Sequence, residues 1–517
     1  MTDDGRLPTD DWLIDAAHYP GGHAAGIIFP RSIADVIDAL STSPSVLAIG
    51  AQSSLTGGAT PMGEVILATT KMTRIIDVQP GRITVEPGVT VAAMQERLAE
   101  ASAWFPPAPT FTGACAGGIV ATNAAGAATF KYGSTRDWVE ALTVVLADGT
   151  VLDLARGTNR ARNGQFEVET ASGRLSVPVP TYRMPQVAKR SAGYHAAPAM
   201  DLIDLFIGSE GTLGVITQVT FKTLSPAPNT VLAWIPCAAE PRGLALVKAL
   251  RDASIKTWQT GDADGVDACA IEHMDRRSLE ILREDGADRR NNVSIPEGTE
   301  LALLVQVELR ADTDAAQAFE QIQDSLGSAT PGSPLGNFCR LLDQAEAFAD
   351  AELALPHDRR RAAELLAVRE AVPAGVNQRI NTARRTIDAR IEKTAGDMVV
   401  PFDRCAEMMA LYREGFEARG LDYAIWGHLS DGNVHPNVIP RSYDDVVKGK
   451  EAMLEFGWHV ARLGGCPLAE HGVGRNPVKQ ALLRQLYGDA GIDEMRAVKH
   501  ALDPGNRLAP GVIFPTG

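Results

Sequence analysis

The chain has 517 residues, of which 45% are hydrophobic and 22% charged, and its formal net charge is −15. This composition is typical of a soluble globular protein, and the length is sufficient for two or three domains. The negative charge argues against a nucleic-acid partner, because phosphates require a basic surface. No apolar run approaches the length of a membrane-spanning helix. The acidic N-terminus lacks the basic start and apolar core of a secretion signal.

The six cysteines are scattered along the chain, and none of them forms a C-x-x-C pair. This spacing argues against a disulfide framework, a cysteine-rich zinc module and an iron–sulfur cluster in this chain. Reduced cysteines fit a cytoplasmic location, either free or peripheral at the membrane.

The first part of the chain is predicted to alternate short strands with helices. Ser32 and Thr90 are placed to cap the helices that follow them, because their hydroxyls can accept hydrogen bonds from N–H groups at a helix start. Strands are predicted where short apolar runs are bounded by turn residues. In chain order, the expected elements are a strand at 27–29, a helix at 33–40, strands at 46–49 and 82–86, a helix at 91–101, and a hairpin of strands 139–146 and 151–154.

Three loops of this region are crowded with small and hydroxyl residues: Gly50–Gly58, Phe105–Gly133 and Gly208–Gly214. Glycine lets backbone approach a ligand closely, and exposed N–H groups suit anions. The loops therefore favour a phosphate-bearing cofactor that lies along the backbone, and the alternative is that they are ordinary turns. There is no Gly-x-Gly-x-x-Gly that opens a βαβ unit and no P-loop, so a nicotinamide cofactor is disfavoured.

Ser225-Pro-Ala-Pro228 indicates a domain boundary, which divides the chain into domains 1–227 and 228–517. The second domain is predicted to be α+β, with charged helices and without small-residue loops up to about residue 400. Asn476 and Pro477 are suited to the cap and the first position of a late helix. Further expected helices lie at 359–369 and 451–463, and Leu502-Asp-Pro-Gly505 ends the last one.

The stretch from Trp426 to Asn437 carries two histidines around Asp431-Gly432, a strong signal for a two-residue hairpin turn. Residues that face each other across such a hairpin have Cβ atoms roughly 4.5–5.5 Å apart, so two imidazoles there could bind one divalent cation. The alternative is that the histidines are simply packed or hydrogen-bonded. The pairs expected to face one another are His428 with His435, Leu429 with Val434, and Ser430 with Asn433.

Glu470-His471 follows 35 residues after His435, among small residues and glycines. It would supply a carboxylate ligand and a further imidazole, which strengthens the metal interpretation. The segment 426–475 is therefore the predicted metal and catalytic segment of the second domain.

The three loops, in order, resemble the flavin-binding segments of the FAD-linked oxidase family, which has the vanillyl-alcohol oxidase or p-cresol methylhydroxylase fold. The resemblance rests on Ile49–Pro61, Phe105–Gly133 and Gly208–Thr217. It implies an α+β fold with a two-lobed FAD-binding domain and an α+β substrate, or cap, domain. The residues His428, His435, Glu470-His471 and Leu502-Asp-Pro-Gly505 resemble the family's 2-hydroxy-acid dehydrogenase branch, which includes D-lactate dehydrogenases, glycolate oxidase flavin subunits and D-2-hydroxyglutarate dehydrogenases.

The resemblance implies that FAD lies along these loops. Family members that tether flavin covalently often use a histidine in the first loop, where this chain has Gln52 and Ser53, so we expect non-covalent FAD. Cys115 is interpreted as a small packing residue. The cofactor-binding residues that the resemblance implies are Gly50, Ala51, Gln52, Ser53, Ser54, Leu55, Thr56, Gly57, Gly58, Pro107, Thr112, Gly113, Gly117, Gly118, Thr122, Asn123, Gly126, Tyr132, Gly133, Glu210, Gly211, Gly214, Val215 and Ile216.

The implied reaction is oxidation of a 2-hydroxy acid to a 2-oxo acid, with hydride transfer to flavin N5. His428, His435 and Glu470 are the expected ligands of a divalent metal, with Zn²⁺ favoured over Mn²⁺ or Fe²⁺. A neutral histidine suits proton removal near pH 7, and His471 is the base that the resemblance implies. Asn437 is expected to hydrogen-bond the substrate.

An arginine is expected to hold the substrate carboxylate through a bidentate pair. The resemblance points to Arg369 and Lys393. D-2-hydroxyglutarate members of the family carry Thr where this chain has Pro373, and the spacing to the lysine also differs here. Four further arginines crowd this region and are alternatives: Arg379, Arg384, Arg385 and Arg390.

A D-lactate- or glycolate-like substrate is favoured, with D-2-hydroxyglutarate or another alcohol as the alternative. Since no cluster-type cysteines are present, electrons must leave to a separate quinone, cytochrome or electron-transfer flavoprotein. The chain could also form a homodimer. Two rival interpretations are an ether-lipid synthase-like flavoprotein of the same fold and a flavin-free binding or scaffold subunit.

Overall fold

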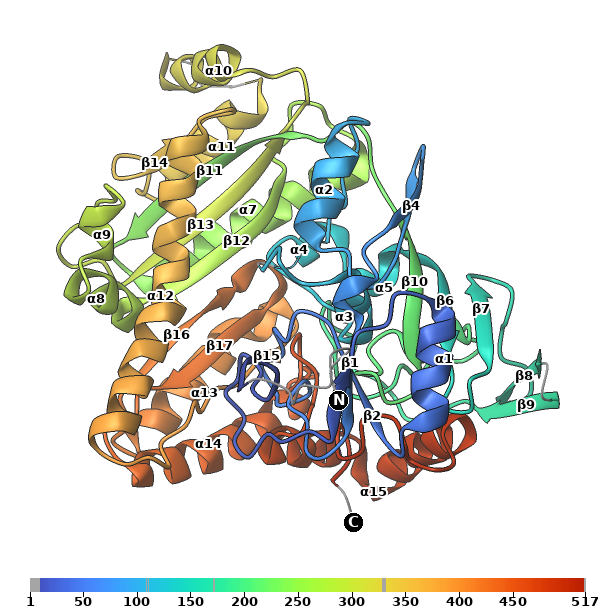
Figure 1. Ribbon diagram of the computed structural model, residues 1–517. Helices are drawn as coiled ribbons and strands as arrows, with labels where there is room; N and C mark the ends of the chain where they lie inside the picture. Colours follow the sequence, from blue (N-terminus) through green and yellow to red (C-terminus); the bar gives the residue numbers. More distant parts are fainter. Residues whose placement is uncertain (1–9, 108, 110, 171–172, 328–331, 516–517) are drawn as a thin grey trace. The chain divides into compact units, whose positions relative to one another are not determined.

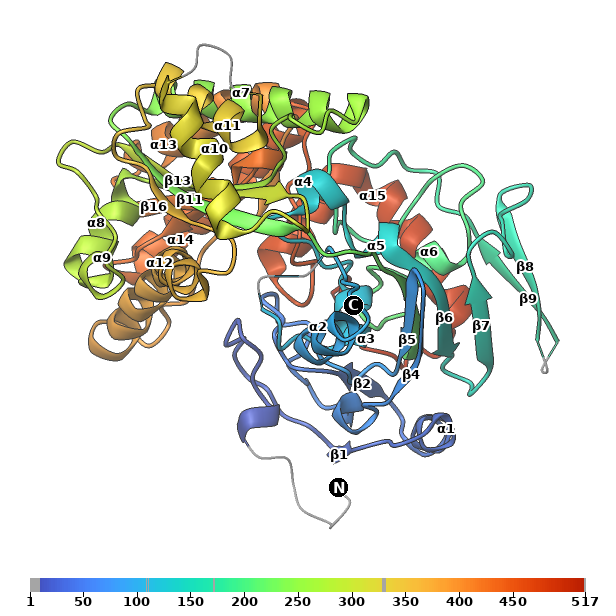
Figure 2. The same ribbon diagram turned by 90° about the horizontal axis from the view of Figure 1, so that it is seen from above.

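A computed structural model describes residues 10–107, 109, 111–170, 173–327 and 332–515 (Figures 1 and 2). The chain divides into two compact units. The first consists of Met1–Gly126, Gly133–Ser225 and Gly457–Gly517, and the second of Ala127–Tyr132 and Pro226–Phe456. The chain thus leaves the first unit beside the predicted boundary at 227. The units differ from the linear division of the sequence because residues 457–517 pack with the first unit.

The first unit contains a parallel sheet in which β3 (Val65–Ala68) lies between β1 (Gly26–Ile28) and β2 (Val46–Ile49). Helix α1 (Ile33–Thr42) packs its apolar side on this sheet, and Val36 and Leu40 are fully buried in that core. The predicted cap is confirmed, because the Ser32 hydroxyl accepts a hydrogen bond from Asp35 N–H.

A five-stranded antiparallel sheet forms the other layer of the first unit, in the order β4-β5-β10-β6-β7. The predicted hairpin at 139–154 is confirmed as β6 paired with β7. The strands are β4 (Ile75–Gln79), β5 (Arg82–Val85), β10 (Val215–Lys222), β6 (Val139–Val145) and β7 (Val151–Ala155), and a separate pair is formed by β8 (Gln165–Thr170) and β9 (Gly173–Pro178).

Two predicted helix starts of the first unit are also confirmed. The Thr90 hydroxyl accepts from Ala93 N–H at the start of α2, and Asn476 caps α15 by accepting from Val478 and Lys479 N–H. The helices of this unit, besides α1, are η1 (Asp10–Trp12), η2 (Thr69–Lys71), α2 (Val91–Ala99), α3 (Ala116–Ala121), α5 (Thr135–Trp138), α6 (Ile203–Phe206) and α15 (Pro477–Leu502).

The second unit is built on a seven-stranded antiparallel sheet in the order β14-β11-β13-β12-β16-β17-β15. One face packs on α8 (Arg276–Glu284) and α12 (Arg359–Thr386), with Trp234, Leu304 and Trp426 in the shared core. Figure 2 shows α7 (Glu240–Thr260) on the opposite side of the strands. The strands are β11 (Asn229–Cys237), β12 (Ala268–Asp275), β13 (Leu301–Leu309), β14 (Glu352–Ala354), β15 (Met398–Val399), β16 (Tyr423–His428) and β17 (Asn433–Val438).

Most of the remaining helices of the second unit are shorter than α7 and α12. Helix α14 is long, and its residues from Gly457 onward belong to the first unit. Helix α12 extends 17 residues beyond the predicted helix at 359–369 and continues through Pro373. The others are α4 (Thr129–Tyr132), α9 (Ala287–Arg290), α10 (Ala315–Gly327), α11 (Pro334–Gln344), η3 (Phe402–Arg404), α13 (Cys405–Glu417), η4 (Leu429–Asp431) and α14 (Tyr443–Arg462). Among the described residues, no helix combines the length and apolarity that a membrane span requires.

Helix α4 belongs to the second unit although its neighbours in sequence belong to the first. Lys131 Nζ lies 2.6 Å from carboxylate oxygens of both Asp267 and Glu308. The Tyr132 hydroxyl donates to Glu308, and the ring of Phe130 packs on Trp258. Two partly buried ion pairs therefore fix this short helix beside β12 and β13, and an aromatic contact joins it to α7.

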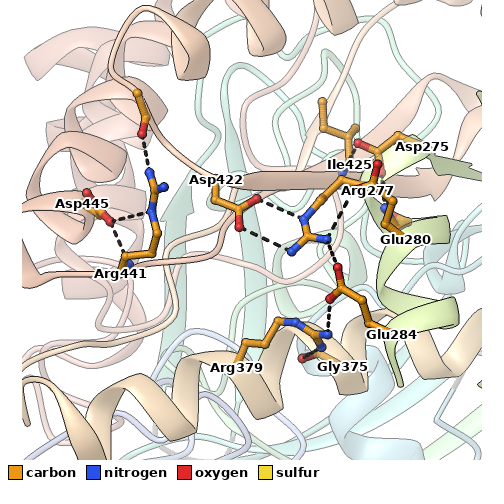
Figure 3. Close-up of polar contacts among 12 residues, drawn as sticks. Asp275, Arg277, Glu280, Glu284, Gly375, Arg379, Asp422, Ile425, Arg441 and Asp445 are labelled. Carbon is orange, nitrogen blue, oxygen red and sulfur yellow. Dashed lines mark hydrogen bonds and ion pairs between the residues drawn. The ribbon is translucent and has the colours of Figure 1, made fainter. Parts of the chain in front are cut away.

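An ion-pair network joins α8 and α12 at the edge of this layer (Figure 3). Arg277 on α8 contacts Asp422, just before β16, and Glu284 on its own helix. Glu284 also contacts Arg379, which lies on α12. The network links the sheet, α8 and α12, and α12 is the helix that carries Arg369.

Candidate functional site

A cavity of about 310 Å³ lies within the first unit and is lined by all three of the small-residue loops. The first and third of these loops are separated by about 150 residues in the sequence, from Gly58 to Gly208, and the fold brings them to one place. Glu470 and His471 also line this cavity. The predicted cofactor-binding residues on its wall are Gly50, Ala51, Gln52, Ser53, Ser54, Leu55, Gly58, Gly117, Gly118, Thr122, Glu210, Gly211, Gly214, Val215 and Ile216.

The remaining predicted residues do not line this cavity, and three of them contact neighbouring residues of the first unit. Asn123 accepts a hydrogen bond from Arg136 N–H, and the Thr56 carbonyl accepts one from Arg475 N–H. A Cβ on Gly57 would clash with the ring of Tyr19. The predicted residues outside the wall are Thr56, Gly57, Pro107, Thr112, Gly113, Asn123, Gly126, Tyr132 and Gly133.

The glycines give the cavity room for a ligand to approach backbone. A Cβ on Gly118 would meet no atom within 4 Å, so this wall position is open. A Cβ on Gly50 would lie 3.1 Å from Cys115 Cβ, which explains why small residues are needed on both sides. Burial raises the pKa of the Cys115 thiol, which fits a packing role. The residues present therefore fit an elongated cofactor held along backbone.

Sequence reasoning missed several residues of this wall. Pro87 precedes Gly88 after β5, and a Cβ on Gly117 would lie only 2.7 Å from its ring. Phe111 is exposed yet lines the cavity. Phe111 lies within the second loop but is neither small nor hydroxyl-bearing, and Pro87 reaches the loops only in the folded chain.

Glu210 connects the third loop to the segment that follows His471. It has a left-handed backbone, with φ 53°. Its carboxylate accepts hydrogen bonds from Val473 N–H and Gly474 N–H, each at 2.8 Å. Burial raises the pKa of this carboxyl to about 7, against the lowering effect of the two N–H groups.

A second connection reaches the same segment from Lys189-Arg-Ser191. The buried Lys189 Nζ lies 2.6 Å from Glu470 Oε1. Ser191 N–H donates to the carbonyls of Leu468 and Ala469, and the Ser191 hydroxyl donates to the Thr122 carbonyl. Sequence reasoning missed Lys189, because a single lysine in a loop gives no signal of burial.

The hairpin register that the sequence predicted is wrong. His428 pairs with Asn433, and His435 pairs with Trp426. The connection is not a two-residue turn at Asp431-Gly432, because η4 takes up residues 429–431 and Gly432 follows with φ 83°. The shift is by two residues, so the two histidines remain on one face as diagonal neighbours. Their ring centroids lie 5.5 Å apart and the rings are perpendicular.

A carboxylate lies beside the Nδ1 atom of each hairpin histidine. His428 Nδ1 is 2.5 Å from Oε1 of Glu272, its partner across the ladder from β12. His435 Nδ1 is 3.6 Å from Asp397 Oδ1. Metal-bound histidines commonly donate their second N–H to a carboxylate, and His428 is placed to do so with Glu272, so the donor set of the hairpin fits a divalent cation.

Arg369 joins this group from α12, where its Nε donates to Glu272 Oε2 at 2.8 Å. Burial would raise the pKa of the Glu272 carboxyl, but the charges of Arg369 and His428 overcome this and hold it below its ordinary value. Sequence reasoning missed Glu272 and Asp397. A charged residue inside the apolar strand β12 was the available signal for Glu272.

Most of the other predicted polar residues have partners of their own in the second unit. Asn437 Nδ2 donates to the His435 carbonyl. The backbone of Asn437 also forms an isolated antiparallel β-bridge with Ala395, which follows Lys393 by two residues. Among the alternative arginines, Arg379 is paired with Glu284 and Asp285, and Arg390 with Asp388. Arg384 Nε donates to the Ile391 carbonyl, and Arg385 is exposed.

The chain matches two family models: the FAD binding domain over residues 24–155, and the C-terminal domain of FAD linked oxidases over residues 239–513. It is 28% identical over 476 residues to glycolate oxidase subunit GlcD of Bacillus subtilis, which covers 90% of this chain and 83% of that protein. It is 28% identical over 531 residues to mitochondrial D-2-hydroxyglutarate dehydrogenase of Bos taurus, covering 100% and 81%. Archaeoglobus fulgidus D-lactate dehydrogenase is 27% identical over 470 residues, covering 90% and 84%.

A solved structure of alkyldihydroxyacetonephosphate synthase matches with a TM-score of 0.55 and 13% identity, covering 94% of this chain and 76% of that one. At this identity the match shows a shared fold alone. The predicted fold, an FAD-binding domain followed by an α+β C-terminal domain, is confirmed. Because the second family model alone covers more than half of the sequence, the chain belongs to the FAD-linked oxidase family.

Proposed function

We propose that this protein oxidises a D-2-hydroxy acid to the 2-oxo acid, with a D-lactate- or glycolate-like substrate favoured and D-2-hydroxyglutarate as the alternative. The observation that carries the proposal is that His471 and Glu470 line the same cavity as the three flavin-type loops. A basic side chain beside the flavin site is what oxidation of a hydroxyl group needs. The names of the relatives, a glycolate oxidase subunit, a D-lactate dehydrogenase and a D-2-hydroxyglutarate dehydrogenase, support the substrate class.

The loop residues would hold FAD without a covalent bond. FAD, when bound, accepts the hydride that leaves the substrate Cα. Gln52 occupies the loop position where a histidine could attach to the flavin, and its Nε2 donates to the Trp12 carbonyl. The open position at Gly118 and the close approach of Gly50 to Cys115 support a cofactor that lies against backbone.

His428, His435 and Glu470 are the proposed ligands of a divalent metal, with Zn²⁺ favoured over Mn²⁺ or Fe²⁺. The two imidazoles would use Nε2, because a carboxylate lies beside Nδ1 in each. The metal, when bound, would lower the pKa of the substrate hydroxyl and orient it. Two nitrogens and one carboxylate oxygen form a ligand set that is common for catalytic zinc.

The chain's own residues would orient the substrate and take its proton. His471 would accept the hydroxyl proton at an imidazole nitrogen. Arg369 and Lys393 would hold the carboxylate, and Asn437 would hydrogen-bond the substrate. Arg369 is preferred to Arg379, because Arg369 contacts the Glu272–His428 pair whereas Arg379 pairs with Glu284 and Asp285.

The electrons would then pass to a separate acceptor, which we propose to be a quinone, a cytochrome or an electron-transfer flavoprotein. A cytoplasmic location, free or at the membrane surface, would suit each of these acceptors. A homodimer is the proposed assembly.

The decisive experiment is anaerobic bleaching of the purified protein's flavin, followed near 450 nm, with D-lactate, L-lactate, glycolate, D-2-hydroxyglutarate and L-2-hydroxyglutarate. We expect rapid bleaching by at least one D acid or by glycolate, and much slower bleaching by the L acids. Flavin that dithionite reduces but that none of these acids reduces would contradict the substrate class. A purified protein that neither contains nor binds flavin would favour the scaffold interpretation.

A further inference from the structure

Lys189 is a fully buried lysine that no step of the proposed reaction uses. Its side chain is 0% exposed, and its Nζ lies 2.6 Å from Oε1 of Glu470, whose side chain is 7% exposed. Removing an ammonium group from water is costly unless a counter-charge and hydrogen bonds compensate for it. The pair therefore fixes both side chains, and one of them is a proposed metal ligand.

Two residues after Lys189, Ser191 ties the backbone to the Glu470 segment and to the cavity wall. Ser191 N–H donates to the carbonyls of Leu468 and Ala469, immediately before Glu470. The Ser191 hydroxyl donates to the carbonyl of Thr122, which lies on the cavity wall. The lysine thus approaches Glu470 from a segment that is already attached to the cavity and to the Glu470 segment.

The contact distinguishes the two oxygens of the Glu470 carboxylate. Oε1 forms the ion pair with Lys189 Nζ, whereas Oε2 lies 3.9 Å from His471 Nε2. An ion pair at one oxygen limits the rotation of the carboxylate about its side-chain torsions. Partners of this kind, one step removed from a metal, orient its ligands and tune their affinity.

We propose that Lys189 is a positioning residue, whose buried ammonium group holds the Glu470 carboxylate as a one-oxygen metal ligand beside His471. This inference rests on the proposed role of Glu470 as a ligand. Without Lys189 the carboxylate loses the contact that fixes its side-chain torsions, and the metal must then order it. Loss of such a partner typically lowers metal affinity 10- to 100-fold.

The test compares Lys189→Met, Lys189→Arg and a matched control, Lys499→Met, in the FAD-loaded protein. Lys499 is also buried in the first unit, and its Nζ lies 2.5 Å from Asp503 and donates to the carbonyls of Thr212 and Leu508. Lys499 itself does not line the cavity. The Zn²⁺ dissociation constant is measured by competition with a chelator, in the absence of substrate. The melting temperature and the flavin spectrum are recorded for each variant, which separates loss of positioning from loss of folding.

We expect Lys189→Met to weaken Zn²⁺ binding roughly 10- to 100-fold, with an unchanged flavin spectrum. Lys189→Arg should recover most of the affinity, because a guanidinium can also pair with the carboxylate. Lys499→Met should lower the melting temperature while Zn²⁺ binding stays at the wild-type level. Wild-type affinity in Lys189→Met, or an equal loss in Lys499→Met, would overturn the inference.

The outcome is independent of the substrate proposal. If no hydroxy acid bleaches the flavin but Lys189→Met still weakens Zn²⁺ binding, the substrate class fails and the inference stands. If the acids bleach the flavin and Lys189→Met binds Zn²⁺ normally, the inference fails alone. A wild-type protein that binds no Zn²⁺ would overturn the inference and leave the flavin chemistry to the bleaching test.

Discussion

The two histidine-bearing segments are held by opposite means. In the second unit, the hairpin of β16 and β17 places His428 and His435 through its backbone ladder. In the first unit, the segment from Ala469 to Arg475 contains no helix or strand. Side chains from elsewhere in that unit hold it instead.

Three side chains from elsewhere in the first unit contact the Ala469–Arg475 segment. Lys189 contacts Glu470, and Glu210 accepts the N–H groups of Val473 and Gly474. Arg475 contacts Glu64 at 2.6 Å. Because a backbone ladder places the β16–β17 histidines, changes to the backbone should disrupt them most. Because side chains hold the Ala469–Arg475 segment, single side-chain substitutions should disrupt that segment most.

The largest effect is expected in the segment itself. His471→Ala should lower the rate of flavin reduction by substrate roughly 10²- to 10⁴-fold, because the proposed base is removed, while FAD stays bound. Stopped-flow reduction under anaerobic conditions measures the rate. The exposed His500 provides a control, since His500→Ala should reduce at the wild-type rate. Normal reduction in His471→Ala would remove His471 from the mechanism.

The hairpin should be most sensitive to a backbone insertion. One residue inserted after Gly432 should change the parity of β17 and turn His435 to the other face, so Zn²⁺ affinity should fall by roughly 100-fold or more while FAD is retained. Chelator competition and flavin absorbance measure the two effects. An insertion after the exposed Gly298, in the same unit, is the control. If the Gly432 insertion binds Zn²⁺ as tightly as the control, the ladder does not set the site.

A side-chain change behind the hairpin should have a smaller effect on the metal. Glu272→Gln keeps the shape but removes the charge that pairs with His428 and Arg369. We expect Zn²⁺ affinity to fall by about 10-fold, the lower end for an outer partner of a metal ligand. Glu280→Gln on α8 is the control, because that carboxylate is 43% exposed and pairs with Arg277 instead of a hairpin histidine. An effect as large as that of the Gly432 insertion would show that the hairpin depends on side chains as much as the segment does.

The last effect concerns folding stability rather than the site, and it comes from the titration of Glu210. The pKa of this carboxyl is about 7 in the folded protein and 4.5 ordinarily, so the folded state retains the proton while the unfolded state loses it. The free energy of unfolding should therefore fall as pH rises from about 4.5 to 7, by up to about 3 kcal/mol. Glu210→Gln should lack this component. Melting temperatures of both proteins between pH 5 and 8 measure it, and parallel curves would contradict the raised pKa.

Much of the fold and part of the site could be predicted from local patterns. Ser32, Thr90 and Asn476 each cap the predicted helix, because capping depends on residues only two or three positions away. The predicted pairing of β16 with β17 differs from the observed pairing by two residues. The reason is that Asp431-Gly432 alone does not reveal the helical turn at 429–431. The shared face of His428 and His435 survived this error because an even shift preserves the alternation of a strand.

The sequence by itself determined where backbone can approach a cofactor, which residues can cap helices, and that two histidines share a strand face. Each of these properties depends on residues that are close along the chain. Only the tertiary structure decided that Lys189 faces Glu470, that Glu272 lies across from His428, and that α4 packs with the second unit. These contacts join residues more than 100 positions apart, where burial and charge pairing act and local propensity carries no information.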